Sequence, residues 1–368
     1  MSSQDVNDSC AVGLPTISEF VTVVRTEGVV IGIVILILSL AILGMFIYNV
    51  WHRCKAFPNL WHRQGVVWWI LGVYTIFAWT SLFGLLFPAA GPLCTFTANI
   101  YLAVTMLMFH KKMLQFFNGH TSSMTEILTG QQMFLQLRNP PCCCCCCCLP
   151  RLNPTKRNFR FITVLVLQKA IVTPINYFIG AVLWINKVYN PGLIAPGDAF
   201  IYIVLINVIS TLFGMWGLIV EFRMFRSIMP SGFKLVPKFM VFQVLIILTT
   251  LQGAIIGMLS TAGIIKCDTT RPISAALKTQ GITFLLTISE SFILSIIATV
   301  VYRKDSEESL AEWAAEVQQM KHKIDTMQSN GDMELHADEV VINHAADQTL
   351  SVEIDNGGFK DKVAAKRN

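Results

Sequence analysis

The chain of 368 residues has little charge: Asp, Glu, Lys and Arg together make up 14% of it, whereas apolar residues make up 54%. A typical soluble domain carries about 25% charged residues, so this chain has too few charges to cover a water-facing surface. The shortage excludes disordered, collagenous, small secreted and ordinary cytosolic proteins. A net charge of +5 by itself indicates neither nucleic-acid binding nor an acidic substrate.

The chain also lacks the sequence motifs of common enzymes. Its seven histidines are scattered, with no His-Glu-x-x-His spacing, and neither a Gly-x-Ser-x-Gly turn nor a Walker-type loop is present. We therefore expect no enzyme activity, no catalytic residue and no bound metal. The first 27 residues do not read as a cleavable signal peptide, so the first apolar stretch is expected to act as an uncleaved signal-anchor.

Charge-free stretches divide the chain into membrane spans. A hydrocarbon core of about 30 Å requires about 20 helical residues, and only Lys169 and Glu290 interrupt stretches of this length. We predict an all-α integral membrane protein with an extracellular segment at 1–28 and a transmembrane domain at 29–303. Its seven helices are expected at about 29–50, 66–87, 93–110, 161–185, 199–220, 239–263 and 280–302.

The basic residues predict the orientation of these spans, because cytoplasmic loops are enriched in Lys and Arg. The first, third and fifth loops are basic, whereas the second has no basic residue and the fourth has only Lys187. This asymmetry places the N-terminus outside and the C-terminus in the cytosol, although the sixth loop, with three basic residues, does not follow it. The sequon at Asn7 is then on the glycosylated side.

Residues beyond the seventh span predict a cytosolic helix at 304–330 and a disordered tail at 331–368. Ser309 and Glu312 form a capping box at the start of this helix. Apolar residues then recur at alternating spacings of three and four over about three heptads, a pattern typical of a short coiled coil or of a helix on the inner leaflet.

Cysteine usage is unusual, because seven of the eleven cysteines form one unbroken run in the third loop. Zinc and iron–sulfur sites use spaced ligands, so a metal site is the weaker interpretation. Juxtamembrane cysteines beside basic residues favour S-palmitoylation, which makes palmitoyl lipid the expected attached group. The predicted acylation sites are Cys142, Cys143, Cys144, Cys145, Cys146, Cys147 and Cys148.

The same loop and two of the spans resemble a known family. The motifs are Arg138-Asn-Pro-Pro before the cysteine run with Leu149-Pro-Arg after it, the stretch from Lys238 to Gln252, and Leu167-Gln-Lys followed by Pro174. With Glu290 in the seventh span, they resemble the organic solute transporter alpha subunit family over roughly residues 30–303.

The resemblance implies facilitated transport of amphipathic organic anions such as bile acids and conjugated steroids. It also implies a single-span beta subunit, with a homo-oligomer as the alternative, and a basolateral plasma membrane, with the endoplasmic reticulum or endosomes as further locations. Two other classes stay open on the residues alone. One is an orphan seven-span receptor, and the other is a membrane scaffold or trafficking factor that transports nothing.

Candidate substrate-binding residues are the polar groups within the spans. Ionisable groups inside a membrane helix cost about 2.5–3.5 kcal/mol on insertion scales and face a protein interior or a wet cavity. Lys169 is expected to attract the carboxylate or sulfate of a substrate; alternatively it pairs with Glu290 or extends to the interface. Gln243, Gln252 and Glu290 are further candidates, with hydrogen bonding between helices as the alternative for Gln252. The nine-residue spacing of the two glutamines puts them on opposite helix faces.

Overall fold

The fold of the chain is known from a computed structural model that describes residues 26–56, 61–115, 135–137, 151–153, 155–189, 197–226, 234–265 and 275–303. The long helices are α3 (Thr26–Ala56), α4 (Trp61–Leu86), α5 (Gly91–Gln115), α7 (Lys156–Ile185), α8 (Ala199–Arg226), α9 (Leu235–Thr261) and α10 (Ala275–Arg303). A 3₁₀ turn, η1 (Pro88–Ala90), joins α4 to α5, and two short strands, β1 (Leu135–Gln136) and β2 (Arg151–Leu152), precede α7.

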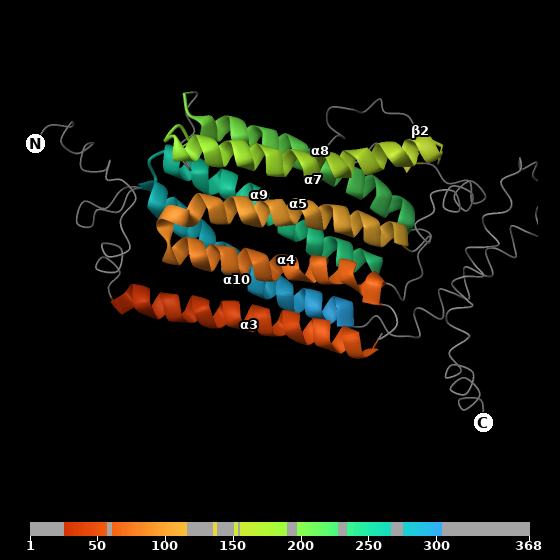
Figure 1. The fold of residues 1–368 in the computed structure, drawn as a ribbon, viewed down its shortest axis with the longest axis horizontal. Helices are drawn as coiled ribbons and strands as arrows, with labels where there is room; N and C mark the ends of the chain where they lie inside the picture. The colour runs from red at the N-terminus through yellow and green to blue at the C-terminus, as the bar shows by residue number, and fades with distance from the viewer. Residues whose placement is uncertain are drawn as a thin grey trace, which may run out of the picture.

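All seven helices are long and apolar enough to cross a membrane, so the predicted all-α, seven-span fold is confirmed. The helices lie side by side and alternate in direction, so that α3 begins at one end of the bundle and α10 finishes at the other (Figure 1). Many large apolar side chains on α3 are exposed, from Val29 through Trp51. A surface of this kind fits a lipid surrounding and not water.

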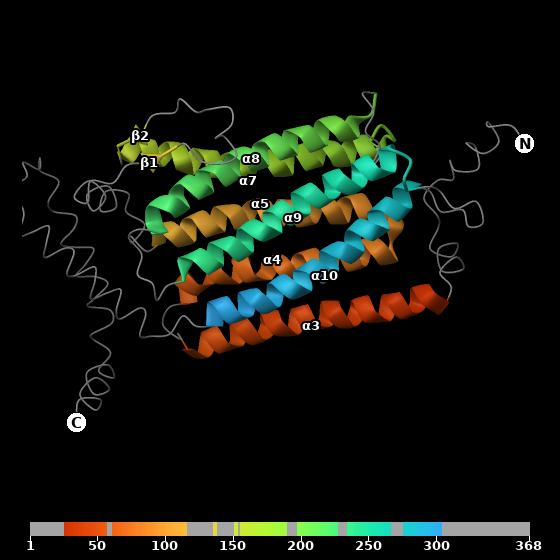
Figure 2. The same ribbon diagram turned by 180° about the vertical axis from the view of Figure 1, so that it is seen from behind.

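The order of packing places α4 and α5 in the interior. Helix α4 packs against α3, α5 and α10, helix α5 packs against α4 and α7, and α7 packs closely on α8. Helix α9 packs mainly on α10. From behind, α3 lies at one edge of the bundle and the α7/α8 pair at the other (Figure 2).

Local sequence explains where several of these elements begin. The hydroxyl of Thr155 accepts a hydrogen bond from the Asn158 amide at the start of α7, and the carboxylate of Asp198 accepts one from the Phe200 amide at the start of α8; both are N-cap interactions. Burial and the nearby Asp198 carboxylate raise the pKa of Tyr189, which lies between these two helices in sequence. Helix α7 continues through Pro174.

Each predicted span lies on one helix, apart from residue 87 after α4 and residues 262–263 after α9, and most of the helices extend beyond the predicted bounds. The extensions at the end of α5, the start of α7 and the end of α8 carry Lys111, Lys156, Arg157, Arg223 and Arg226. These residues lie at one end of the bundle, because α5 and α8 run in the direction opposite to α7 (Figure 1). We refer to this end as the basic end.

Glycines allow the helices to approach closely at two positions. A Cβ atom on Gly84 of α4 would overlap the ring of Phe284 on α10. On α8, a Cβ atom on Gly217 would lie 3.2 Å from Leu165 and Val166 of α7. Small residues are the usual means by which membrane helices pack closely, and here they join α4 to α10 and α7 to α8.

Candidate functional site: a buried lysine and a buried histidine–glutamate pair

Lys169 lies in the middle of α7 and is buried, with 2% of its surface exposed. Its ammonium donates a hydrogen bond to the side-chain oxygen of Asn207 on α8 at 2.6 Å and a longer one to the Asn207 backbone carbonyl at 3.4 Å. Among the residues that the structure describes, no carboxylate lies within ion-pair distance of this ammonium. The charge of Lys169 therefore has dipoles around it and no compensating anion in the described part of the chain.

Three further hydrogen bonds fix α7 against α8 around this lysine. The amide of Gln168 donates to the Ser210 carbonyl, and the hydroxyl of Ser210 donates back to the Gln168 side chain, both at 2.9 Å. Towards the other end, Asn176 donates to the carbonyl of Ile203 at 2.8 Å. Because each of these bonds joins α7 to α8, the lysine lies in a row of polar contacts between the two helices.

Gly214 explains why the lysine fits between these helices. A Cβ atom at this position of α8 would lie 3.0 Å from the methyl group of Met106 and 3.3 Å from the Cβ of Lys169. The absence of a side chain lets α5, α7 and α8 meet at the lysine stem. A long aliphatic stem packed in this way keeps the ammonium at a defined depth.

The other predicted site residues lie on helices that are not packed against α7. Gln252 is half-buried on α9, and its amide donates to the Thr283 carbonyl of α10 at 3.5 Å. Gln243 is buried, and its side-chain oxygen has no partner among the described residues. Glu290 is half-buried on α10, which packs on α3, α4 and α9.

The structure therefore does not join the four candidates into one cluster. Within the described part of the chain, no hydrogen bond or ion pair connects Lys169 with Gln243, Gln252 or Glu290. The alternative that Lys169 pairs with Glu290 is wrong, because the lysine contacts α8 and the glutamate lies on α10. The alternative that Lys169 extends to the membrane interface is also wrong, because its ammonium is bound to Asn207 inside the bundle.

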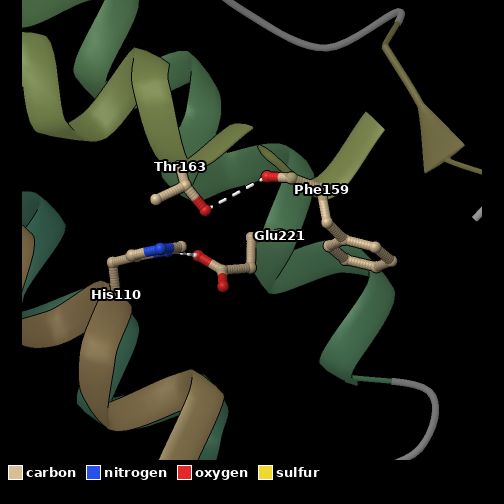
Figure 3. A network of polar contacts seen from close by, with 4 residues as sticks. All are labelled: His110, Phe159, Thr163 and Glu221. Atoms are coloured by element: carbon tan, nitrogen blue, oxygen red, sulfur yellow. Dashed lines mark hydrogen bonds and ion pairs between the residues drawn. The ribbon is translucent and has the colours of Figure 1, made fainter. Parts of the chain in front are cut away.

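A second polar centre, which the sequence reasoning missed, joins α5 to α8 near the basic end. The Nδ1 atom of His110 lies 2.7 Å from the Oε2 atom of Glu221, and the two residues are 2% and 0% exposed (Figure 3). Each residue lies five positions before its helix ends. Because α5 and α8 run in the same direction, equal distances from their ends place the two side chains at one depth, and this is the sequence signal that could have found the pair.

Aromatic stacking brings α9 against α5 and α8 beside this pair. Phe109, next to His110, stacks on Phe242 with ring centroids 5.1 Å apart. Phe222, next to Glu221, stacks on Phe239 at 3.9 Å. Such contacts contribute beyond the area that they bury, and they pack α9 against the segments of α5 and α8 that carry the pair.

The predicted acylation and glycosylation sites, Cys142–Cys148 and Asn7, lie outside the described residues, as do the predicted segments at 304–330 and 331–368. The structure describes what flanks the cysteine run. Leu135 pairs with Leu152 and Gln136 with Arg151 in a small antiparallel ladder. The indole N–H of Trp216 on α8 donates to the Leu137 carbonyl at 3.1 Å, and Leu135 and Leu137 are buried in the main hydrophobic core. The two flanks of segment 138–150 thus pair with each other, and the flank before it is attached to the bundle.

Seven membrane-length helices around a buried lysine and a buried His–Glu pair define a multi-pass membrane protein with ionisable groups in its interior. Such groups are rare inside membrane proteins and mark functional sites. Residues 29–307 match the family model of the organic solute transporter Ostalpha. Because this match covers most of the chain, the protein belongs to the organic solute transporter alpha family.

Individual relatives agree with this assignment. The chain is 29% identical to the organic solute transporter subunit alpha of Leucoraja erinaceus over 72% of this chain and 73% of the relative. It is 26% identical to the protein of the same name from Danio rerio over 76% and 83%, and 28% identical to the one from Homo sapiens over 64% and 68%. No solved structure matches the chain. The family is one of transporter subunits, and the word subunit in these names implies that the relatives assemble with a partner.

Proposed function

We propose that this protein is the alpha subunit of a facilitative transporter that moves amphipathic organic anions, such as bile acids and conjugated steroids, down their electrochemical gradient. One observation carries the choice of an anion: the buried Lys169 ammonium has no carboxylate partner among the described residues, while amide and carbonyl dipoles hold it in place. A substrate carboxylate or sulfate would supply the missing charge, and charge-assisted hydrogen bonds are the strong ones.

The remaining candidates are given supporting roles in the same proposal. The unpartnered side-chain oxygens of Gln243 and Gln252 can accept hydrogen bonds from substrate hydroxyls. Glu290, half-buried on α10, would repel a second anion and so limit where a substrate lies. The extensive apolar surface of the bundle would suit the hydrocarbon body of an amphipathic substrate.

The proposal includes a single-span beta subunit and a plasma membrane location, basolateral in epithelia, with the N-terminus outside. The residues at the basic end of the bundle support this orientation. The cysteine run from Cys142 to Cys148 is proposed to carry palmitoyl groups, and Asn7 a glycan. The described ladder and the Trp216 contact support the acylation, because they attach the flanks of the run to the bundle at the basic end.

Reconstituted flux tests the transport proposal. Proteoliposomes that contain the full chain with a co-purified single-span partner are expected to take up labelled steroid sulfate or bile salt until inside and outside concentrations balance. Vesicles with the chain alone should take up much less. The absence of flux under both conditions, with every partner that co-purifies from native membranes, would refute the transport proposal.

Mass spectrometry of intact peptides tests the acylation proposal independently of flux. Protein from native membranes should show mass increases of palmitoyl size on at least some of the seven thiols, and hydroxylamine treatment should remove them. Cys94, which lies near the start of α5 and away from the basic end, serves as an internal reference because no acylation is expected there. Seven free thiols in the run would contradict the proposal.

A further inference from the structure

His110 and Glu221 are ionisable groups to which the transport proposal assigns no role. Their first contact is a 2.7 Å interaction between Nδ1 and Oε2. Their second polar atoms, His110 Nε2 and Glu221 Oε1, are buried and have no hydrogen-bond partner among the described residues. Most buried polar atoms in proteins are satisfied, so two unsatisfied atoms on one ion pair require an explanation.

The neighbouring helices offer these atoms no fixed partner. Thr163 of α7 lies beside the pair (Figure 3), but its hydroxyl already donates to the Phe159 carbonyl at 3.1 Å. Helix α9 contributes the aromatic rings of Phe239 and Phe242. From β1, Leu135 is apolar and buried, and α4 carries no charged residue from 64 to 86.

Charged groups at the same end of these helices are cations that point mainly to the surface. Lys112 is half-buried, and Lys238 of α9 is buried with its ammonium 5.4 Å from the centre of the Tyr302 ring. The carboxylates on the described residues other than Glu221 are Glu27 in the first turn of α3, Asp198 at the opposite end of α8, and Glu290 on α10. The exposed cations are Lys111, Lys156, Arg157, Arg160, Arg223 and Arg226.

We propose that His110 and Glu221 form a proton-binding site whose occupancy holds α5 against α8. When the two side chains are separated and in water above about pH 6.5, the histidine is neutral and the glutamate is ionised. Together they then carry one negative charge. Side by side in the bundle, that uncompensated charge would be costly. Uptake of one proton from water at the basic end, bound by the imidazole nitrogen or the carboxylate oxygen that is otherwise unpartnered, makes the pair neutral without breaking another bond.

The direction of the pH dependence follows from this count of protons. The paired state holds one proton more than the separated groups above about pH 6.5, so acid favours pairing and alkali favours separation of α5 from α8. The equilibrium shifts by at most about tenfold per pH unit for one proton. Below about pH 6.5 the separated histidine takes up a proton as well, and the dependence is lost.

Hydrogen–deuterium exchange of the full chain in lipid nanodiscs tests the proton site without a substrate, so its result does not depend on the transport proposal. After correction for the intrinsic effect of pH on exchange, peptides covering 104–115 and 218–226 should be up to about 30-fold more protected at pH 6.5 than at pH 8.0. Peptides from α3 should show no such change.

Two substitutions make the test specific. Glu221→Gln keeps an acceptor for the histidine and removes the ionisable group, and His110→Gln removes the imidazole; in each, the pH dependence of protection should be lost. His52→Asn, in an exposed histidine of α3, is a matched control in which protection should vary with pH as in the wild type. Protection in the wild type that does not vary with pH, or variation that persists in both test variants, would overturn the proposal.

Discussion

Lys169→Met is expected to lower anion uptake per surface-expressed molecule by at least about tenfold, because a hydrogen bond to a charged group contributes about 1.5–3 kcal/mol. Methionine fills the space of the lysine stem beside Gly214 and Met106 but has no charge. The bundle should therefore keep its fold while the substrate loses its cationic partner. Uptake of labelled steroid sulfate, divided by surface abundance from biotinylation, measures the effect.

Charge and position are separated by two further variants. Lys169→Arg should retain a larger share of the uptake than the methionine variant, since it keeps the cation. Lys187→Gln removes an equal charge from an exposed lysine just after α7, at the end of the bundle opposite the basic end. This variant should leave uptake unchanged. Equal uptake by Lys169→Met and wild type would show that this lysine does not contact the transported anion.

His110→Leu is expected to destabilise the bundle by about 3–5 kcal/mol, because removal of one partner leaves the other charge buried without compensation. Glu221 is completely buried, and in the described part of the chain His110 is its hydrogen-bond partner. Thermal unfolding of the purified protein in nanodiscs, followed by tryptophan fluorescence, should show the loss as a lower Tm at neutral pH.

The double variant His110→Leu with Glu221→Met distinguishes loss of an ion pair from loss of packing. Apolar replacement of both partners removes the unpaired charge, and such replacements are often neutral for stability. Most of the lost stability should therefore return. If the double variant is as unstable as the sum of its single variants, the histidine contributes through its shape and not through its interaction with Glu221.

The spans could be predicted from the sequence because lipid imposes a length and a composition on each of them. Charge-free stretches of membrane length were enough to find seven helices, and each predicted span overlaps one observed helix, with an excess of one residue after α4 and two after α9. The charge-free stretches do not show which helices are neighbours. Every span is apolar around most of its circumference, so no amphipathic face identifies a partner, and the placement of Lys169 opposite Asn207 needed the structure.

The His110–Glu221 pair was missed for a related reason. Both residues mark the end of a charge-free stretch, and in the sequence they are indistinguishable from the basic and polar residues that follow each span. Only the parallel direction of α5 and α8, together with equal distances to the helix ends, brings them to one depth. A comparison of all ionisable residues at equal depth on parallel spans would have suggested the pair.

The small ladder between β1 and β2 makes the packing of the helices independent of the length of the cysteine-bearing segment. Leu135 and Leu152 pair directly, and Leu137 is bound by Trp216, so the two ends of the loop are fixed next to each other whatever lies between them. Closing a flexible loop of twice the length costs only about 0.6 kcal/mol more. The number of cysteines can thus change by insertion or deletion with little effect on how the helices pack, which makes this segment a place where members of one family can diverge freely.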